Sequence, residues 1–224
     1  MEKKYVLCYG DSNTWGVSPI RDGAGKPLVR LPEDERWTGI AQNILGDAYK
    51  LLVDGNCGRT TVWDDPIEGY KNGAAYLPPC LWSHMPLDLV IIMLGTNDLK
   101  PRFNLSAYDI SLGIEVLINI VKNSGCGYNG TIPPILIMSP IHVKENRKGT
   151  WLHEMFGDEQ RAQQSHLFAK YYKIIADRYN CEFLDAAEFA RPSDADGIHI
   201  DPPDHFKLGQ AVAKKIKNIL GDRK

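Results

Sequence analysis

Five short apolar runs recur along the chain, and longer segments with a helical spacing of apolar residues separate them. The runs cover residues 5–9, 49–53, 89–94, 135–138 and 181–184. Apolar runs of this length that do not alternate with polar residues are typical of parallel strands buried on both faces. Because strand and helix alternate throughout, we predict one α/β domain over residues 1–224. Its expected architecture is a three-layer α/β/α sandwich around a five-stranded parallel sheet.

Four segments are expected to form helices that pack on this sheet. Three of them cover residues 36–45, 107–121 and 159–179. The fourth begins at Asp201, which is followed by two prolines where a first helical turn tolerates them. The residues expected to face the core are Trp37, Ile40, Ala41, Ile44, Ile110, Ile114, Leu117, Ile118, Val121, Leu167, Tyr171, Ile174, Ile175, Ala176, Leu208, Val212, Ile216 and Ile219.

Two long loops interrupt the alternation, over residues 17–35 and 141–157. The first is rich in glycine, proline and charge, and the second is polar but contains Trp151, Met155 and Phe156. Long loops in a compact domain tend to carry function. The aromatic residues of the second loop favour a substrate wall or an interface, and an ordinary surface loop remains the alternative.

Composition narrows the classes of protein to which this chain can belong. It has 224 residues, of which 43% are hydrophobic and 24% charged, and its net charge is −2, which gives no electrostatic attraction to nucleic acid or anionic membranes. No apolar run approaches the ~18 residues of a membrane span, and the N-terminal run is too short for a secretory leader. Five cysteines, no two closer than 23 positions, predict neither a disulfide framework nor a chelating pair. We therefore expect a reducing, cytoplasmic location.

Polar residues of the types found in catalytic and binding sites follow the predicted strands or precede the last helix. These segments cover residues 10–12, 54–60, 95–98, 139–142 and 196–199. In open parallel sheets, ligands bind outside the carboxyl ends of the strands, where the strand order reverses. We therefore expect these segments to gather around one site.

Ser12 stands where the first predicted strand meets a helix, directly after Asp11. A serine there lies among free backbone N–H groups and at the positive end of a helix dipole, which suits a nucleophile. His199 can take the serine proton, and Asp196 can orient the imidazole across a tight turn at Gly197. Taken alone, the pattern at Ser12 fits a simple helix cap equally well.

An oxyanion that forms at this serine needs hydrogen-bond donors on neighbouring loops. The candidates are the backbone N–H groups of Ser12 and Gly58 and the side-chain amide of Asn97. Taken singly, Gly58 and Asn97 can also be ordinary turn residues. A metal site in the last polar cluster of the chain is an open alternative. Prolines interrupt that cluster, and we expect no metal or organic cofactor. The cluster comprises Asp196, His199, Asp201, Asp204 and His205.

In order and spacing, these blocks resemble the motifs of the GDSL, or SGNH, hydrolases, a family named for its Ser, Gly, Asn and His. The resemblance implies a flavodoxin-like SGNH hydrolase fold. It also implies a nucleophile at Ser12, a base at His199 with Asp196 as its partner, and an oxyanion hole formed by Ser12, Gly58 and Asn97. Where the family often has leucine after the serine, this chain has Asn13. The segments 36–39, 59–61, 64–66, 72–78 and 87–98 resemble the bacterial arylesterase and acyltransferase (perhydrolase-type) subgroup.

We therefore expect a serine esterase that hydrolyses short-chain acyl or aryl esters through an acyl-enzyme on Ser12, with acyl transfer or perhydrolysis as a further capacity. Carbohydrate or natural-product deacetylation on the same machinery is the alternative, and a non-catalytic ligand-binding or assembly module is the alternative from another class. The expected partner is a small ester, and the resemblance implies a homo-oligomer whose neighbouring chains narrow the acyl pocket. The pocket residues expected are Asp11, Trp15, Trp151 and Phe156.

Overall fold

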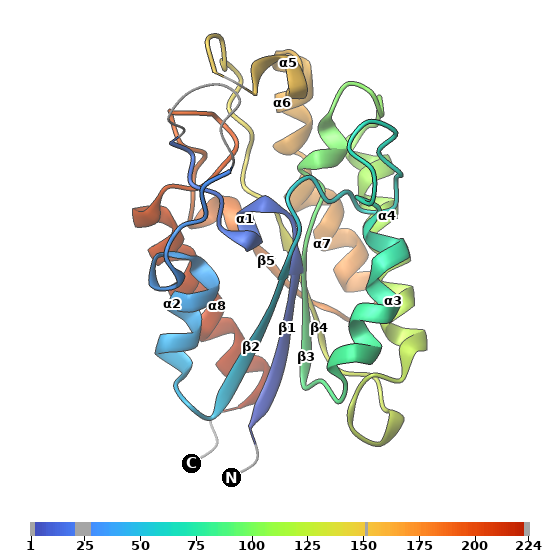
Figure 1. The fold of residues 1–224 in the computed structure, drawn as a ribbon. Coiled ribbons are helices and arrows are strands. Elements are labelled where there is room, and N and C mark those ends of the chain that lie inside the picture. Colours follow the sequence, from blue (N-terminus) through green and yellow to red (C-terminus); the bar gives the residue numbers. More distant parts are fainter. Residues whose placement is uncertain (1–2, 21–27, 151, 222–224) are drawn as a thin grey trace.

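The computed structural model describes residues 3–20, 28–150 and 152–221, which contain one parallel five-stranded sheet (Figure 1). The strands lie in the order β2-β1-β3-β4-β5, so the strand order reverses between β1 and β3. Strand bounds are β1 Lys4–Gly10, β2 Tyr49–Gly55, β3 Leu89–Met93, β4 Ile135–Ser139 and β5 Glu182–Asp185. The predicted sheet and its five strands are confirmed, and their carboxyl ends meet along one edge.

Helices cover both faces of the sheet, which gives the predicted three layers (Figure 1). One face carries α2 (Trp37–Leu45) and α8 (Pro202–Leu220), and the other carries α3 (Gly73–His84), α4 (Ala107–Ser124) and α7 (Phe168–Arg178). Alternate residues of β1 show how one strand serves both cores. Val6 and Cys8 pack in the cluster beneath α2 and α8, whereas Leu7 and Tyr9 pack in the cluster beneath the other helices.

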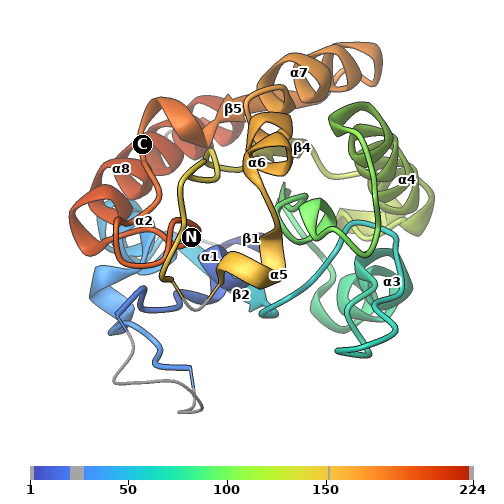
Figure 2. The ribbon, with the colours of Figure 1, turned by 90° about the horizontal axis from the view of Figure 1, so that it is seen from above.

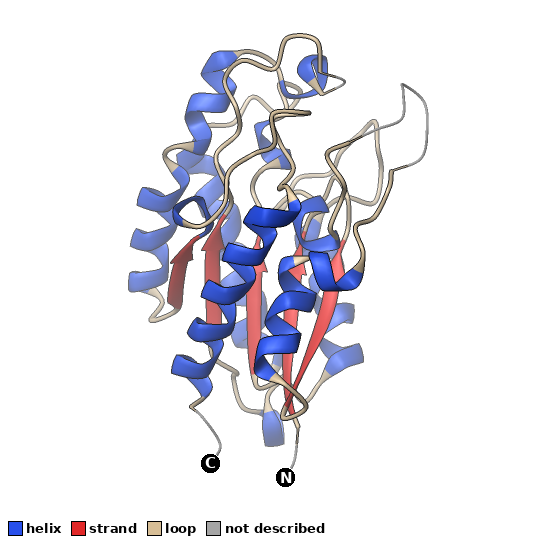
Figure 3. Ribbon diagram, turned by 90° about the vertical axis from the view of Figure 1, so that its left-hand side faces the viewer, coloured by secondary structure: helices blue, strands red, loops and turns tan. Residues whose placement is uncertain are grey.

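Three short helices lie beyond the carboxyl ends of the strands, where the loops gather (Figures 2 and 3). They are α1 (Ser12–Trp15), α5 (His153–Phe156) and α6 (Glu159–Ser165). Short 3₁₀ helices occur at Glu33–Glu35, Asn97–Leu99, Tyr128–Gly130 and Ala186–Glu188. Among the described helices, none has the length and apolar character needed to cross a membrane.

The segment 159–179, predicted as one helix, is two helices that meet at His166 and Leu167. There the backbone bonds tighten to three-residue spacing, from His166 N to Gln163 O and from Leu167 N to Gln164 O. This tightening rotates the apolar face of the second helix, so Leu167 and Ile174 are 38% and 48% exposed. The buried stripe of α7 consists of Phe168, Tyr172, Ile175 and Ala176.

Helix α3 was not predicted, because Pro78 and Pro79 lie inside it and proline usually ends a helix. Its start is well defined, since the Asn72 side chain accepts a hydrogen bond from Ala75 N. Smaller differences concern single side chains. Ile44 is 42% exposed on α2, because that helix buries the stripe containing Trp37 and Ala41.

Candidate active site

The turn after β1 presents Ser12 at the start of α1. The Asp11 carboxylate accepts the Asn13 N–H at 3.0 Å and caps the helix. A Cβ on Gly10 would lie 2.0 Å from Thr14 Oγ1, so only glycine allows the strand to turn this closely into the helix. Ser12 is only 7% exposed, and it is one of the residues that line a cavity at this edge of the sheet. The cap and the candidate nucleophile are thus adjacent residues with separate tasks.

His199 connects Ser12 to Asp196 through two hydrogen-bonded contacts. His199 Nε2 lies 3.0 Å from Ser12 Oγ, and His199 Nδ1 lies 2.6 Å from Asp196 Oδ2. The other carboxylate oxygen of Asp196 accepts the backbone N–H groups of Ile198 and His199, each at 2.9 Å. Gly197 has φ +75°, a left-handed conformation that lets the loop double back on the carboxylate. The geometry matches a serine, its base and a group that orients the base.

The Asp196 carboxylate remains charged in this buried position. Burial on its own would raise the pKa of Asp196, but the hydrogen bonds from the His199 ring and from the two backbone N–H groups outweigh it. They hold the pKa below its usual value. A charged carboxylate can fix the tautomer with a proton on Nδ1 and stabilise the imidazolium that forms when Nε2 takes a proton.

Asn13 joins the two halves of this arrangement, a role that the sequence did not suggest. Its side chain donates from Nδ2 to Ile198 O at 3.2 Å and accepts from Ile200 N at 3.1 Å. These two backbone groups flank His199. In addition, Trp37 Nε1 donates to Asn13 O at 3.1 Å. The residue after the serine therefore ties the base-bearing loop to the nucleophile turn.

The three residues that carry the candidate oxyanion donors line the same cavity. Gly58 has φ +87°, a conformation that favours glycine, and it lies on this cavity wall with Ser12 and Asn97. Asn97 donates one hydrogen of its side-chain amide to Arg59 O at 3.1 Å. Because an amide NH₂ has two hydrogens, the second one is available to a ligand. The structure thus brings together five predicted site residues from four loops.

The next residue, Asp98, connects the Asn97 loop to the segment that contains Thr61. It is fully buried and accepts hydrogen bonds from Thr61 N and Thr61 Oγ1. Burial raises the pKa of Asp98 to about 6, against the lowering effect of the Thr61 hydrogen bonds. This bond connects the loop after β3 with the loop after β2, so Asn97 and Gly58 are held in one rigid unit.

The cavity has a volume of about 310 Å³ and an apolar side formed by α5 and the residue before it. Phe156, which is 3% exposed, and Met155 and Leu152 form that side. The lining also includes the buried Lys100, whose ammonium pairs with Glu68 and lies 6.0 Å from the centroid of the Phe156 ring. The full set of described lining residues is Ser12, Leu28, Cys57, Gly58, Glu68, Asn97, Lys100, Leu152, Met155, Phe156 and His199.

Of the four residues predicted for the substrate pocket, Phe156 is among those that line this cavity. Asp11 lies beneath the nucleophile turn, 2% exposed, and its carboxylate caps α1. Burial raises the pKa of Asp11 to about 6. The Trp15 ring lies under the Arg30 guanidinium, 4.8 Å from its carbon, and Trp15 does not appear among the described lining residues. Trp151 lies outside the described residues.

The acidic and histidine residues near α8 do not converge on a metal position. Asp196 and His199 bond each other, while His205 Nδ1 accepts the Trp37 N–H at 3.2 Å. The Asp204 carboxylate accepts the Arg191 N–H at 3.0 Å. Their donor atoms therefore serve separate partners. Burial lowers the pKa of His205 to about 4, so this imidazole is neutral at physiological pH.

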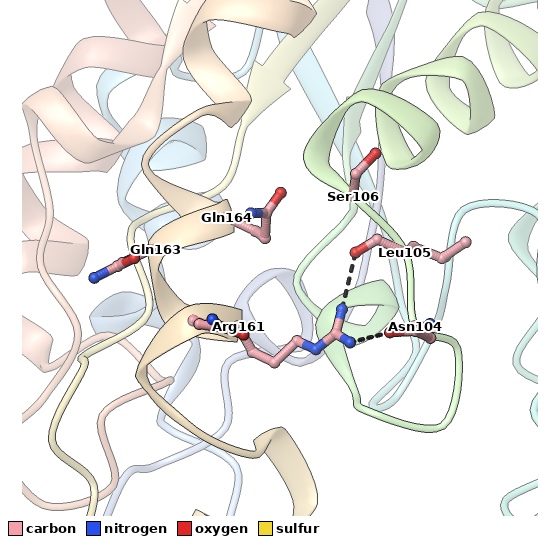
Figure 4. Close-up of a pocket in the computed structure, with 7 residues that line it drawn as sticks. Asn104, Leu105, Ser106, Arg161, Gln163 and Gln164 are labelled. Atoms are coloured by element: carbon pink, nitrogen blue, oxygen red, sulfur yellow. Dashed lines mark hydrogen bonds between the residues drawn. The ribbon is translucent and has the colours of Figure 1, made fainter.

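A second cavity of about 460 Å³ lies between α6 and the loop that precedes α4 (Figure 4). Arg161 crosses it and donates to Leu105 O at 3.1 Å and to Asn104 Oδ1. Its other lining residues are Ser106, Gln160, Gln163 and Gln164. Amides and one guanidinium provide no base for a nucleophile, so catalytic chemistry is better supported at the Ser12 cavity.

Comparisons with known proteins identify a family and similar solved structures. A family model described as the GDSL-like lipase/acylhydrolase family matches residues 8–211. A search of curated proteins gave no match. Among solved structures, the native aryl esterase of M. smegmatis is 39% identical, with 97% of this chain and 100% of that chain covered and a TM-score of 0.89. A carbohydrate acetylesterase from Sinorhizobium meliloti is 38% identical, with 96% and 99% covered and a TM-score of 0.89.

Proposed function

Because the chain belongs to the GDSL-like lipase/acylhydrolase family and is an ester hydrolase, we propose that Ser12, His199 and Asp196 are its catalytic triad. The observation that carries the proposal is the continuous series of contacts from the Asp196 carboxylate through both nitrogens of His199 to Ser12 Oγ. Each contact joins side chains that are less than a tenth exposed. In such a dry site, a proton passes between groups that are already aligned.

In the acylation step, Ser12 Oγ attacks the ester carbonyl carbon while His199 Nε2 accepts the serine proton. The imidazolium then gives that proton to the leaving alcohol as the C–O bond breaks, and the acyl group stays on Ser12. In deacylation, His199 takes a proton from water as the water oxygen attacks the acyl carbon. His199 then returns that proton to Ser12 Oγ as the bond between the acyl carbon and Ser12 Oγ breaks and the acid leaves. Asp196 holds the imidazole in position throughout both steps.

The carbonyl oxygen becomes negatively charged when the serine attacks. We place this oxyanion against the backbone N–H groups of Ser12 and Gly58 and the free amide hydrogen of Asn97. All three groups belong to the lining of one cavity, which supports this placement. None of the three donors changes its protonation during the reaction, so each stabilises the developing charge without reorganisation.

We propose short acyl groups as the preferred substrates. The cavity of about 310 Å³ is at the lower end of the volumes typical of ligand sites, and Phe156 and Leu152 close it on the apolar side. The related solved structures are an aryl esterase and a carbohydrate acetylesterase, so aryl acetates and O-acetylated sugars are the two leaving-group classes to compare. The same apolar side favours acyl transfer to an alcohol or peroxide, because it limits the access of water to the acyl-enzyme.

Two further parts of the proposal concern the protein in its cellular setting. All five cysteines are free thiols, which supports a reducing location such as the cytoplasm. Large apolar side chains are exposed in the loop after β2, with Ile67 at 75%, and near the end of α3, with Trp82 at 60%, which supports self-association. Sedimentation of the purified protein at several concentrations tests the second point.

A fluorophosphonate, which reacts with activated serines, tests the assignment of the nucleophile. We expect a single adduct on Ser12, located by mass spectrometry of peptides from the labelled folded protein. The matched control is Ser18→Ala, which removes the next serine along the chain and should leave labelling unchanged. Labelling that persists in Ser12→Ala would assign the nucleophile elsewhere. A panel of aryl acetates, longer acyl esters and acetylated sugars then ranks the substrates by kcat/KM.

A further inference from the structure

A cluster of three potential metal ligands lies on the edge strand of the sheet, outside the catalytic cavity. Asp54 belongs to β2, and Cys80 and His84 belong to α3. One ligand atom from each of them lies within 4.8 Å of the other two. We propose that Asp54, Cys80 and His84 form a site for a divalent transition-metal ion of the zinc class.

The distances within this cluster suit tetrahedral coordination. In a tetrahedral zinc site, bonds of about 2.3 Å to sulfur and 2.0 Å to oxygen place those two ligand atoms about 3.5 Å apart. Here Cys80 Sγ lies 3.3 Å from Asp54 Oδ2. Cys80 and His84 are four residues apart on one helix, a spacing that puts their side chains next to each other on the same face. Only small side-chain adjustments are therefore needed to close three ligands around one ion.

The ligand types select the metal. Thiolate and imidazole are preferred by zinc and other late transition metals, whereas calcium and magnesium require sites built almost wholly from oxygen. In the structure the Cys80 thiol donates to Asp54 Oδ2. When the cation binds, the thiol proton leaves to solvent and the cation takes its place between the two side chains. The Cys80 thiolate then offsets one positive charge of the ion, and the Asp54 carboxylate is shared between the ion and the Arg59 guanidinium.

Arg59 orients the carboxylate of this site from the other side. Its Nη2 donates to Asp54 Oδ1 at 2.7 Å, and its Nη1 donates to Asp54 O at 2.7 Å. The guanidinium thus holds the oxygen that faces away from Cys80 and leaves Oδ2 for the metal. Ligating carboxylates are usually fixed by such outer hydrogen bonds. Arg59 therefore fixes the orientation of the Asp54 carboxylate and does not occupy the metal position.

An ion can reach the cluster from solvent. Cys80 is only 2% exposed, but the Asp54 side chain is 17% exposed and His84 is half-buried. Asp54 also lines a cavity of about 960 Å³, together with Arg59 and Tyr76. With three protein ligands, the fourth coordination position remains for a water molecule or a small ligand from this cavity.

Metal binding should be measured in the Ser12→Ala protein, so that the result does not depend on the proposed catalytic function. We expect one Zn²⁺ per chain by isothermal titration calorimetry, and a thiolate-to-metal charge-transfer band when Co²⁺ is added. Removing an outer-shell partner of a metal usually costs 10–100-fold in affinity, so removing a ligand should cost at least about 100-fold. Cys80→Ser and His84→Ala should each show that loss, and Cys80→Ser should also lose the Co²⁺ band.

Matched variants locate the ion. Cys181→Ser and His166→Ala make the same substitutions outside the cluster and should bind Zn²⁺ as tightly as the parent, as should His199→Ala. His84 is at the helix end and half-buried, so His84→Ala keeps the test decisive if Cys80→Ser does not fold. The proposal is overturned if the parent binds no Zn²⁺, if binding persists in both cluster variants, or if His199→Ala abolishes it.

Discussion

The turn after β1 and the loop before α8 each place a buried aspartate within three residues of a member of the proposed triad. Asp11 and Asp196 are 2% and 0% exposed. Asp196 accepts from the His199 ring and from two backbone N–H groups, and its pKa lies below the usual value. Asp11 accepts from Asn13 N, and burial raises its pKa to about 6. Two carboxyl groups of similar exposure therefore differ in pKa, because Asp196 accepts more hydrogen bonds than Asp11 and lies beside the His199 ring.

This difference separates two tasks that adjacent loops perform. The carboxylate of the second loop keeps its charge over the pH range in which an imidazole base works, so it can stabilise an imidazolium. The carboxyl group of the first turn needs no charge for its task, since a neutral oxygen also caps a helix. Proximity to the nucleophile thus does not identify the aspartate that orients His199. The hydrogen-bond donors around each carboxyl group identify it.

The largest expected effect comes from Asp196→Asn. The amide cannot carry the negative charge. Its NH₂ group donates a hydrogen bond to His199 Nδ1, so the imidazole proton moves to Nε2 and the ring has the wrong tautomer to accept a proton from Ser12. We expect kcat to fall by about 10⁴, measured with an aryl acetate. The matched change Asp11→Asn should reduce kcat by less than about 10-fold.

Two controls make this pair of variants informative. Circular dichroism should show that both remain folded, and the double variant Ser12→Ala with Asp196→Asn should be no slower than Ser12→Ala, because triad members act as a unit. Equal losses in Asp11→Asn and Asp196→Asn would contradict the division of tasks between the two loops.

A second experiment distinguishes charge stabilisation from proton transfer. Asn97→Ala removes one proposed oxyanion donor, and we expect kcat to fall by about 10²–10³ with little change in KM. Because Asn97 does not handle protons, the pH dependence of kcat/KM should keep its shape, whereas Asp196→Asn should alter it. A changed pH profile in Asn97→Ala would mean that the amide acts through His199 instead.

Much of the fold was predictable, because strands buried on both faces leave unbroken apolar runs. The break at His166 was not, since neither proline nor glycine marks it and apolar residues continue across it. The contact of Ser12 with His199 follows from placing Ser12 after the first strand and His199 before the last helix, at the same edge of the sheet. The role of Asn13 depends on backbone groups of Ile198 and Ile200, 185 and 187 positions away, which no local pattern encodes.

Asn13→Ala tests whether the two loops depend on each other. Asn13 joins them by donating to Ile198 O and accepting from Ile200 N. Without these bonds His199 is less firmly aligned with Ser12, and we expect kcat to fall by about 10–100-fold, since small misplacements are costly. Asn13→Asp keeps the acceptor but loses the donor, so it should lie between Asn13→Ala and the parent. Activity equal to the parent in Asn13→Ala would show that each loop holds its own geometry.

Asp11→Asn should have the smallest effect on activity. The pH dependence of its stability tests most directly how the two carboxyl groups differ. The pKa of Asp11 is raised from 3.8 to about 6 by burial, so between these values the folded protein binds more protons than the unfolded chain. The stabilising contribution of protonated Asp11 is complete below pH 3.8 and is lost as the pH rises through about 6. Asn13 N remains capped in the variant, because an asparagine oxygen accepts the same hydrogen bond.

The free energy of unfolding, measured by urea denaturation, should therefore fall with rising pH in the parent relative to Asp11→Asn. One group contributes a slope of at most about 1.4 kcal/mol per pH unit within this window and none above it. Burial also raises the pKa of Asp98 to about 6, and the charge of Asp11 adds to that increase. The difference between the two proteins therefore reports the titration of Asp11 together with the smaller change that its removal causes at Asp98. A difference that rises with pH would mean that the pKa of Asp11 is lowered, as that of Asp196 is, and the contrast between the two loops would then rest on position alone.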